Sequence, residues 1–153
     1  GACFICSKEN FLKIVFEDEL WLDKTDYPLG EDQVMYYKMY LMGLKILTWY
    51  DHHFIHLDGG ENMVTEKKRK VIYSDFRFRL IFWHRYIYIP NKSLLSRCLS
   101  LFSILYILIF TLFISFIKFD FDILKLKYKA IVDAMFFIKS NEYKGIPLIV
   151  KSV

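Results

Sequence analysis

The chain has 153 residues, which supports one domain with a core of ordinary size. Its 55% apolar and 19% aromatic content excludes a disordered chain, because so many large side chains can offset the conformational entropy lost on folding. The mean hydropathy of +0.25 predicts that part of the apolar surface meets lipid or another protein.

Charge is distributed unevenly around a net value of +4. Residues 1–66 are acidic, residues 67–97 carry nine basic side chains and one acidic side chain, and an uncharged run follows at 98–117. This order is typical of a chain at an anionic membrane surface. Nucleic acid is the less favoured partner, because the aromatic residues lie in apolar runs and are not spaced along a basic groove.

The cysteines indicate a reducing compartment. Cys3 and Cys6 form a lone C-x-x-C with no second pair that would complete a zinc site, and the third cysteine stands apart. No charged region followed by an apolar stretch opens the chain, so no signal peptide is expected. Together these features predict a cytoplasmic location.

In chain order, the first expected element is a short buried strand at residues 2–6, where the sequence is continuously apolar. Residues 8–14 fit a turn or a short helix. Residues 15–29 are acidic and rich in turn formers, which predicts a loop.

The clearest predicted helix begins at Glu31-Asp32 and ends at Gly43. Asp32 suits the N-cap or first turn, because its carboxylate meets free backbone N–H groups and the positive end of the helix dipole. Gly43 suits the position that ends a helix. Apolar residues recur between them at helical spacing: Val34, Met35, Tyr37, Met39, Leu41 and Met42.

Residues 44–50 have the composition of a strand, and they lead into a loop with three histidines, His52, His53 and His56. Such a group could form a hydrolytic metal site. The spacing differs from that of a helical H-E-x-x-H pair, however, so a structural role is favoured for His52 and His53.

A second helix is expected from Ser74, as its N-cap, through residues 75–89 to Pro90. The alternation of Phe76, Phe78 and Leu80 also fits a strand, and both alternatives stay open.

The uncharged run at 98–117 is long enough to cross a hydrocarbon core of about 30 Å. Its hydroxyl side chains fall in one stripe of a helical wheel: Ser100, Ser103, Thr111 and Ser115. A helix of this kind could span the membrane, lie in its interface or pack on protein. A last helix through residue 139 and a turn at 141–147 complete the chain.

Taken in order, these pieces resemble the second half of a family 2 glycosyltransferase of the A-type nucleotide-sugar fold, similar to rhamnosyltransferases. The matching segments are G-A-C-F-I at 1–5, F-E-D-E at 16–19, Glu31-Asp32, G-L-K-I at 43–46, His56 with Gly59-Gly60, R-F-R…H-R at 77–85 and K-A-I-V-D-A at 129–134. Tyr86 departs from the family, where Asn often follows the Arg.

The resemblance implies an α/β fold with few strands, divided into a catalytic part at 1–90 and a membrane-associated helical tail at 91–153. The half that binds the nucleotide sugar through a D-x-D motif is expected outside this chain, which alone would be inactive. Asp120-Phe121-Asp122 has that spacing but stands far from the expected place.

The implied function is transfer of a sugar from a nucleotide sugar to a saccharide or lipid-linked acceptor, in cell-surface polysaccharide synthesis at the cytoplasmic face of the membrane. Asp32 would be the catalytic base and Glu31 would orient it or bind an acceptor hydroxyl. His56 would help to bind a divalent metal, Mn²⁺ or Mg²⁺. Trp83, Arg85 and the basic run at 67–70 could hold the phosphates of a lipid-linked acceptor.

Each of these roles has a plainer alternative. Asp32 would also serve as a helix cap, Trp83 as a core residue, and the basic run at 67–70 as a solvated face. For the whole chain, the alternative is a small membrane-surface protein without catalysis.

Overall fold

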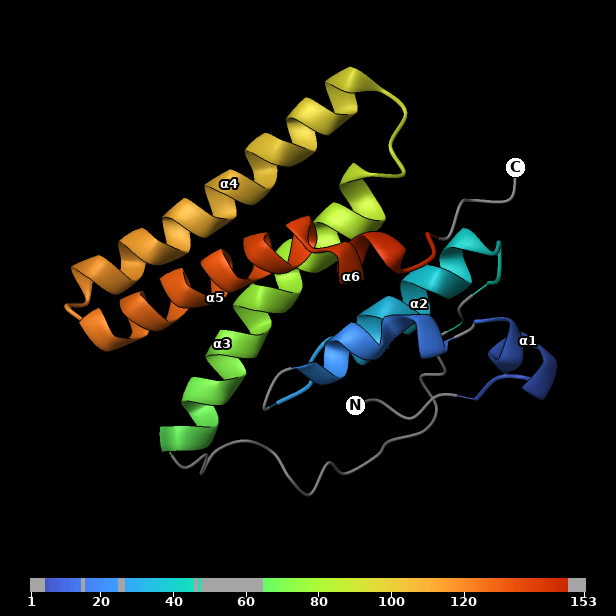
Figure 1. The fold of residues 1–153 in the computed structure, drawn as a ribbon, viewed down its shortest axis with the longest axis horizontal. Coiled ribbons are helices and arrows are strands. Elements are labelled where there is room, and N and C mark those ends of the chain that lie inside the picture. Colours follow the sequence, from blue (N-terminus) through green and yellow to red (C-terminus); the bar gives the residue numbers. More distant parts are fainter. Residues whose placement is uncertain (1–4, 15, 25–26, 46, 48–64, 149–153) are drawn as a thin grey trace.

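A computed structural model describes residues 5–14, 16–24, 27–45, 47 and 65–148 (Figure 1). The elements in chain order are α1 (Lys8–Lys13), the 3₁₀ segment η1 (Phe16–Lys24), α2 (Glu31–Leu41), α3 (Thr65–Phe82), the π-helical segment η2 (Trp83–Tyr88), α4 (Leu94–Ile117), α5 (Phe121–Lys139) and α6 (Asn141–Gly145). The described residues contain no strand.

The predicted α/β fold is therefore wrong, and this part of the chain is all-helical. Ile5 and Leu47, from the two predicted strands, are 88% and 89% exposed, and neither lies in regular structure. A short apolar run cannot be assigned to a strand by periodicity alone, and a strand holds its place only when a neighbouring strand pairs with its backbone. Cys6, Leu44 and Lys45 lie outside regular structure as well, and the other residues of the two predicted strands lie outside the described part.

The predicted loop at 15–29 is also corrected, since η1 occupies much of it. Trp21 of η1 is buried and stacks on Phe78 of α3, with 6.0 Å between the ring centroids. The turn formers misled the prediction, because tertiary packing of one large aromatic ring fixes this segment in place.

The helix predicted at Glu31-Asp32 is confirmed as α2, and the short helix at 8–14 as α1. Gly43 has a φ of +75°, the left-handed conformation expected of a residue that ends a helix. Tyr37 of α2 packs edge-on against Phe82 and Tyr86, each at 5.5 Å between centroids. Aromatic side chains thus attach α2 to α3 and η2.

The second predicted helix is longer than expected. α3 begins at Thr65, so Ser74 lies inside it and is no N-cap. The charged residues before Ser74 are good helix formers, and they extend the helix along its exposed side. Phe76, Phe78 and Leu80 are all buried because α3 is covered from more than one side, which also explains the strand-like alternation.

Helices α4 and α5 form an antiparallel hairpin, and α5 also packs along α3 in the most extensive helix contact of the described part (Figure 1). Ala130 and Ala134 on α5 are completely buried, and these small side chains let the helices approach closely. Between the two, Tyr73 donates a hydrogen bond of 2.6 Å to Asp133 Oδ2. The predicted boundary at residue 90 falls in the turn between η2 and α4, and helices from its two sides pack on each other.

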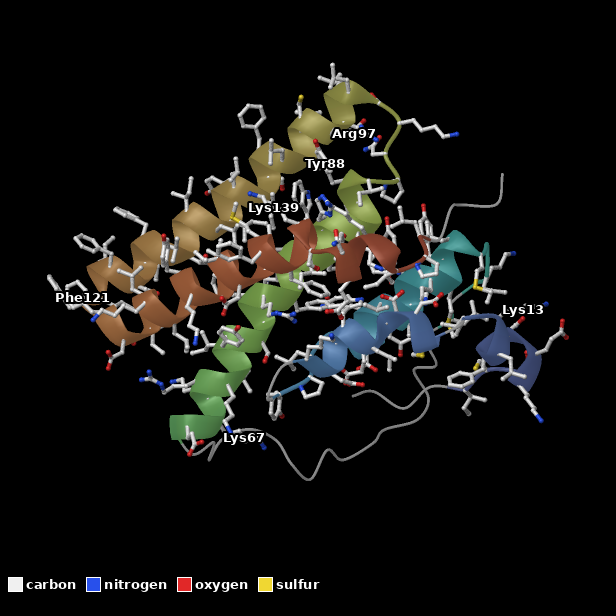
Figure 2. All side chains as sticks on the ribbon, viewed as in Figure 1. Lys13, Lys67, Tyr88, Arg97, Phe121 and Lys139 are labelled. Atoms are coloured by element: carbon white, nitrogen blue, oxygen red, sulfur yellow. The ribbon has the colours of Figure 1, made fainter. Side chains whose placement is uncertain are left out.

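The end of the hydroxyl stripe of α4, at Thr111 and Ser115, faces protein. Ser115 is buried and accepts a hydrogen bond of 2.7 Å from Lys127 Nζ of α5, which also donates to the Thr111 carbonyl at 3.2 Å. The outer edge of α4 carries side chains that are almost wholly carbon, and Phe121 projects beside the tip of the hairpin (Figure 2). Thr111 and Ser115 of the stripe thus meet α5, while Ser103 and the apolar face of α4 are left exposed.

Candidate functional site

The Glu31-Asp32 pair lies in the first turn of α2. Gly30 is the N-cap, in a left-handed conformation with φ of +91°, and no side chain caps the helix. Asp32 is half-buried and makes no hydrogen bond or ion pair with the described residues. The plainer role predicted for Asp32, a capping hydrogen bond, is therefore absent, while its carboxylate still lies at the positive end of the helix.

Packing fixes where this helix begins. A Cβ atom added to Gly30 would overlap the ring of Phe78, so only glycine fits between α2 and α3 at this point. The positive φ excludes most other residues independently. Gly30 therefore sets both the direction of α2 and the place of the acidic pair that follows it.

Next to the start of α2 is an open cavity of about 260 Å³, which we call the α3–α4 groove. Its lining residues come from four elements: Gln33 of α2, Phe78, Arg79 and Phe82 of α3, Trp83 and Ile87 of η2, and Ser100, Ser103, Ile104 and Ile107 of α4. Gln33 directly follows Asp32 in α2, so the acidic pair adjoins a lining residue in sequence, although neither Glu31 nor Asp32 lines the groove.

The groove is apolar with a few polar groups. Arg79 is held by an ion pair, with 2.8 Å between its Nε and Asp75 Oδ2. The indole N–H of Trp83 is buried and has no hydrogen-bond partner in the described part of the chain. Apolar walls with a small number of polar groups suit an elongated, largely apolar ligand that carries a polar end.

Of the two predicted acceptor contacts, Trp83 lies in the groove and Arg85 does not. Arg85 is 1% exposed, and its guanidinium binds the carboxylate of Glu19 and donates to the Pro147 carbonyl at 2.6 Å. A direct contact between Arg85 and an acceptor would require this buried pair to open.

Glu19 is the centre of a buried charge cluster that the sequence did not reveal. Its Oε1 lies 3.0 Å from Lys38 Nζ and 3.0 Å from Arg85 Nη2, and Trp21 Nε1 donates to Oε2 at 2.6 Å. Burial alone raises the pKa of Glu19, but hydrogen bonds and charge from Arg85 outweigh burial and hold this pKa below its usual value. The carboxylate is thus kept ionised, and the cluster joins η1, α2 and η2.

His84 is another residue that the sequence left without a role. Its Nδ1 lies 2.8 Å from the hydroxyl oxygen of Tyr143, which attaches α6 to η2. Burial lowers the pKa of His84 and raises that of Tyr143 to about 12. Both side chains are therefore neutral at physiological pH, and this contact is a neutral hydrogen bond.

The predicted metal ligand His56 lies outside the described residues, as do His52 and His53. Within the described ranges, no three His, Cys, Asp or Glu side chains gather as metal ligands would. Asp120 caps α5 and Asp122 lies 3.8 Å from Arg69, so both members of the D-x-D spacing contact other protein groups. The divalent metal stays a prediction.

Sequence reasoning missed several groove residues, Gln33, Arg79 and Ile107 among them. Ser100 and Ser103 were signalled by the hydroxyl stripe of α4. Comparison of the chain with known protein families, with curated proteins and with solved structures finds no match. Function must therefore be argued from the chain itself.

Proposed function

We infer that this chain is the acceptor-side part of a membrane-associated glycosyltransferase, whose donor nucleotide sugar is bound by a region outside these residues. One observation carries this proposal. The acidic pair that the family resemblance assigns to catalysis opens α2 directly before Gln33, which lines an apolar groove, and a helix suited to lipid forms one wall of that groove.

Helix α4 supports the membrane part of the proposal. Its 24 residues extend over about 36 Å and are apolar enough to cross a hydrocarbon core of about 30 Å. Large apolar side chains on it are left in contact with solvent, and Phe102, Tyr106 and Ile109 are each more than 60% exposed. An uncovered apolar surface of this size is typical of a membrane or protein contact.

The ends of α4 carry the charges expected near lipid headgroups. Lys92 and Arg97 lie at its start and Lys118 at its end. Arg97 donates hydrogen bonds to the carbonyls of Ile89 and Asn91 and stacks over Tyr88, so it closes the turn beside the helix (Figure 2). Basic and aromatic residues at both ends of an apolar helix favour an interfacial position for these ends.

In the proposed reaction, an acceptor seated in the groove presents its hydroxyl to Asp32. The carboxylate takes the hydroxyl proton as the oxygen bonds to the anomeric carbon, and the bond from that carbon to the diphosphate breaks. Glu31 holds the acceptor hydroxyl or orients Asp32. A divalent metal would offset the charge on the departing diphosphate, and His56 is its predicted ligand.

A lipid-linked acceptor fits this arrangement better than a soluble saccharide. The apolar walls of the groove would hold the first part of a lipid chain, and the buried Trp83 N–H offers a donor to an oxygen near the polar end. The lipid tail would then continue along the exposed face of α4 into the membrane.

Blocking the groove tests this proposal. In membranes from cells that express the complete protein, Ser103→Trp should raise the acceptor KM at least about tenfold, since a large ring would fill the site, with donor KM unchanged. Phe102→Trp is the matched control, because it places the same ring on the exposed face of α4. Transfer is followed as label passing from a panel of nucleotide sugars into lipid extracts. Equal acceptor KM values for the two variants would refute the groove as the acceptor site.

A further inference from the structure

A second cavity, which we call the α3–α5 cleft, has a volume of about 390 Å³ and very different chemistry. Its lining residues are Lys24 of η1, Glu66, Arg69, Lys70, Tyr73 and Ser74 of α3, and Leu126 and Lys129 of α5. Four of these side chains are cationic, one is acidic and one is aliphatic. It shares no residue with the α3–α4 groove, so a ligand of another class would occupy it.

The cations of the cleft are only loosely engaged. Lys70 lies 3.3 Å from Glu66, Arg69 lies 3.8 Å from Asp122, and both cationic side chains are more than 40% exposed. Lys24 pairs with Glu142, and these two side chains are about half exposed. Exposed pairs of this kind contribute little to stability, so the cations can turn to a more highly charged anion at little cost.

Lys129 provides the excess positive charge. It lies over the ring of Tyr73, 5.9 Å from the centroid, and no carboxylate pairs with it among the described residues. Tyr73 is held by its hydrogen bond to Asp133 of α5, which fixes the ring under the lysine. The four lining cations are paired with three carboxylates, Glu66, Asp122 and Glu142, so one cation is in excess of the ion pairs, and the nearby Asp133 carboxylate is engaged by Tyr73.

Ser74 gives an independent indication of a ligand. Its residue is 2% exposed, it lines the cleft, and its hydroxyl has no hydrogen-bond partner in the described part of the chain. A buried hydroxyl without a partner is unfavourable, and an oxygen atom entering the cleft would accept from it. No helix-capping role accounts for Ser74, since α3 begins nine residues earlier at Thr65.

From these observations we propose that the α3–α5 cleft binds a phosphate or diphosphate group. Arg69 would supply a planar pair of donors to two phosphate oxygens, Lys24, Lys70 and Lys129 would supply point charges, and Ser74 would donate to a third oxygen. Phosphate is favoured over a carboxylate ligand because several cations converge on one site. The proposal is independent of the groove and of Asp32.

Calorimetry on the chain in detergent, with inorganic pyrophosphate as the probe, tests the cleft. Arg69→Gln with Lys70→Gln should weaken binding at least about tenfold, and Ser74→Ala should weaken it several-fold. The matched control is Lys67→Gln with Lys68→Gln. It removes the same charge from the same basic run of α3, outside the cleft lining, and should change affinity less than about twofold.

Vesicles distinguish the source of the phosphate group. Because α4 alone would carry the chain to any bilayer, the readout is the difference in binding between vesicles with phosphatidic acid and vesicles of phosphatidylcholine only. A difference that falls with the Arg69/Lys70 pair but not with the Lys67/Lys68 pair, without pyrophosphate binding, assigns the cleft to a lipid headgroup. Equal losses of binding in the Arg69/Lys70 and Lys67/Lys68 double variants would overturn the proposal. So would the absence of binding to both pyrophosphate and phosphatidic acid. Either failure leaves the Asp32 and groove experiments unaffected.

Discussion

The guanidinium of Arg85 and the carboxylate of Glu19 meet in the core across 66 residues of sequence, at 3.1 Å from Nε to Oε2 and 3.0 Å from Nη2 to Oε1. Both side chains are at most 1% exposed, and Lys38 is the third charged group of the cluster. One carboxylate therefore compensates two buried cations. The first acidic segment of the chain is attached in this way to the end of the long helix formed by α3 and η2.

Glu19→Gln should lower the free energy of unfolding by about 3–5 kcal/mol, because it removes the buried carboxylate that pairs with Arg85 and Lys38. Urea unfolding in detergent measures this loss of unfolding free energy. Glu9→Gln, in the exposed pair with Lys13, is the control and should leave the unfolding midpoint unchanged. Replacing all three charges by Leu at Glu19 and Met at Lys38 and Arg85 should cost less than Glu19→Gln alone. A Glu19→Gln protein as stable as the Glu9→Gln control would contradict the stabilising role of the buried cluster.

Stability should fall with decreasing pH in two separate windows. The folded-state pKa of His84 lies below the usual 6.5, so the unfolded state binds more protons as pH falls from about 6.5 toward that lower value. The folded-state pKa of Glu19 lies below the usual 4.5, so a second loss occurs as pH falls below about 4.5 through the folded value.

His84→Gln separates the two windows. This substitution should remove the loss of stability that His84 causes in the upper pH window and leave the loss in the lower window. Unfolding free energies measured at closely spaced pH values would show the difference. An unchanged slope between about pH 5 and 6.5 would mean that His84 is not held neutral by burial.

Gly30→Ala should destabilise the protein more than Gly43→Ala. Both glycines have positive φ, so both substitutions incur about 1–2 kcal/mol of backbone strain. Only at Gly30 does the new Cβ meet another group, the Phe78 ring, whereas nothing lies within 4 Å at Gly43. Melting temperatures of the two variants measure the difference. Partial rescue of Gly30→Ala by Phe78→Leu is expected, and equal losses at the two glycines would show that the contact is unimportant.

The helices were predictable where local signals agree. At α2, a glycine, an acidic first turn and apolar residues at helical spacing all indicate one start and one end. The two strands could not be judged locally, because an apolar run gains strand structure only from a partner strand. The start of α3 was missed because Ser74 was taken as its N-cap, although the basic residues before Ser74 favour a helix.

The site was predictable only in part, for a similar reason. Asp32 and Trp83 stand in recognisable sequence surroundings. Trp83 lines the groove, and Asp32 directly precedes the lining residue Gln33. Arg85 lies two residues after Trp83 in the same sequence surroundings, but its guanidinium is buried in the core and pairs with Glu19. Which of two neighbouring side chains faces a groove depends on packing between distant segments, and no local pattern records it.

The exposed face of α4 should hold the chain in bilayers. Ile109→Lys, near the middle of the helix, places a charge where lipid is expected, at a cost of about 2.5–3.5 kcal/mol on insertion scales. Flotation with neutral vesicles at high salt should show reduced binding for this variant. Leu12→Lys makes the same kind of change on exposed α1 and should bind as the unmodified chain does. Equal binding of the two variants would mean that protein, and not lipid, covers α4.

The most direct test of the account is the transfer rate of the complete protein with Asp32→Asn. Asn is nearly isosteric, and no capping hydrogen bond of Asp32 is lost, so the melting temperature should fall only by the small amount that the carboxylate contributes at the positive end of α2. Loss of the general base should lower kcat at least about a hundredfold, with the donor KM little altered. Near-normal kcat in a correctly folded Asp32→Asn protein would contradict the assignment of Asp32 as the base that activates the acceptor.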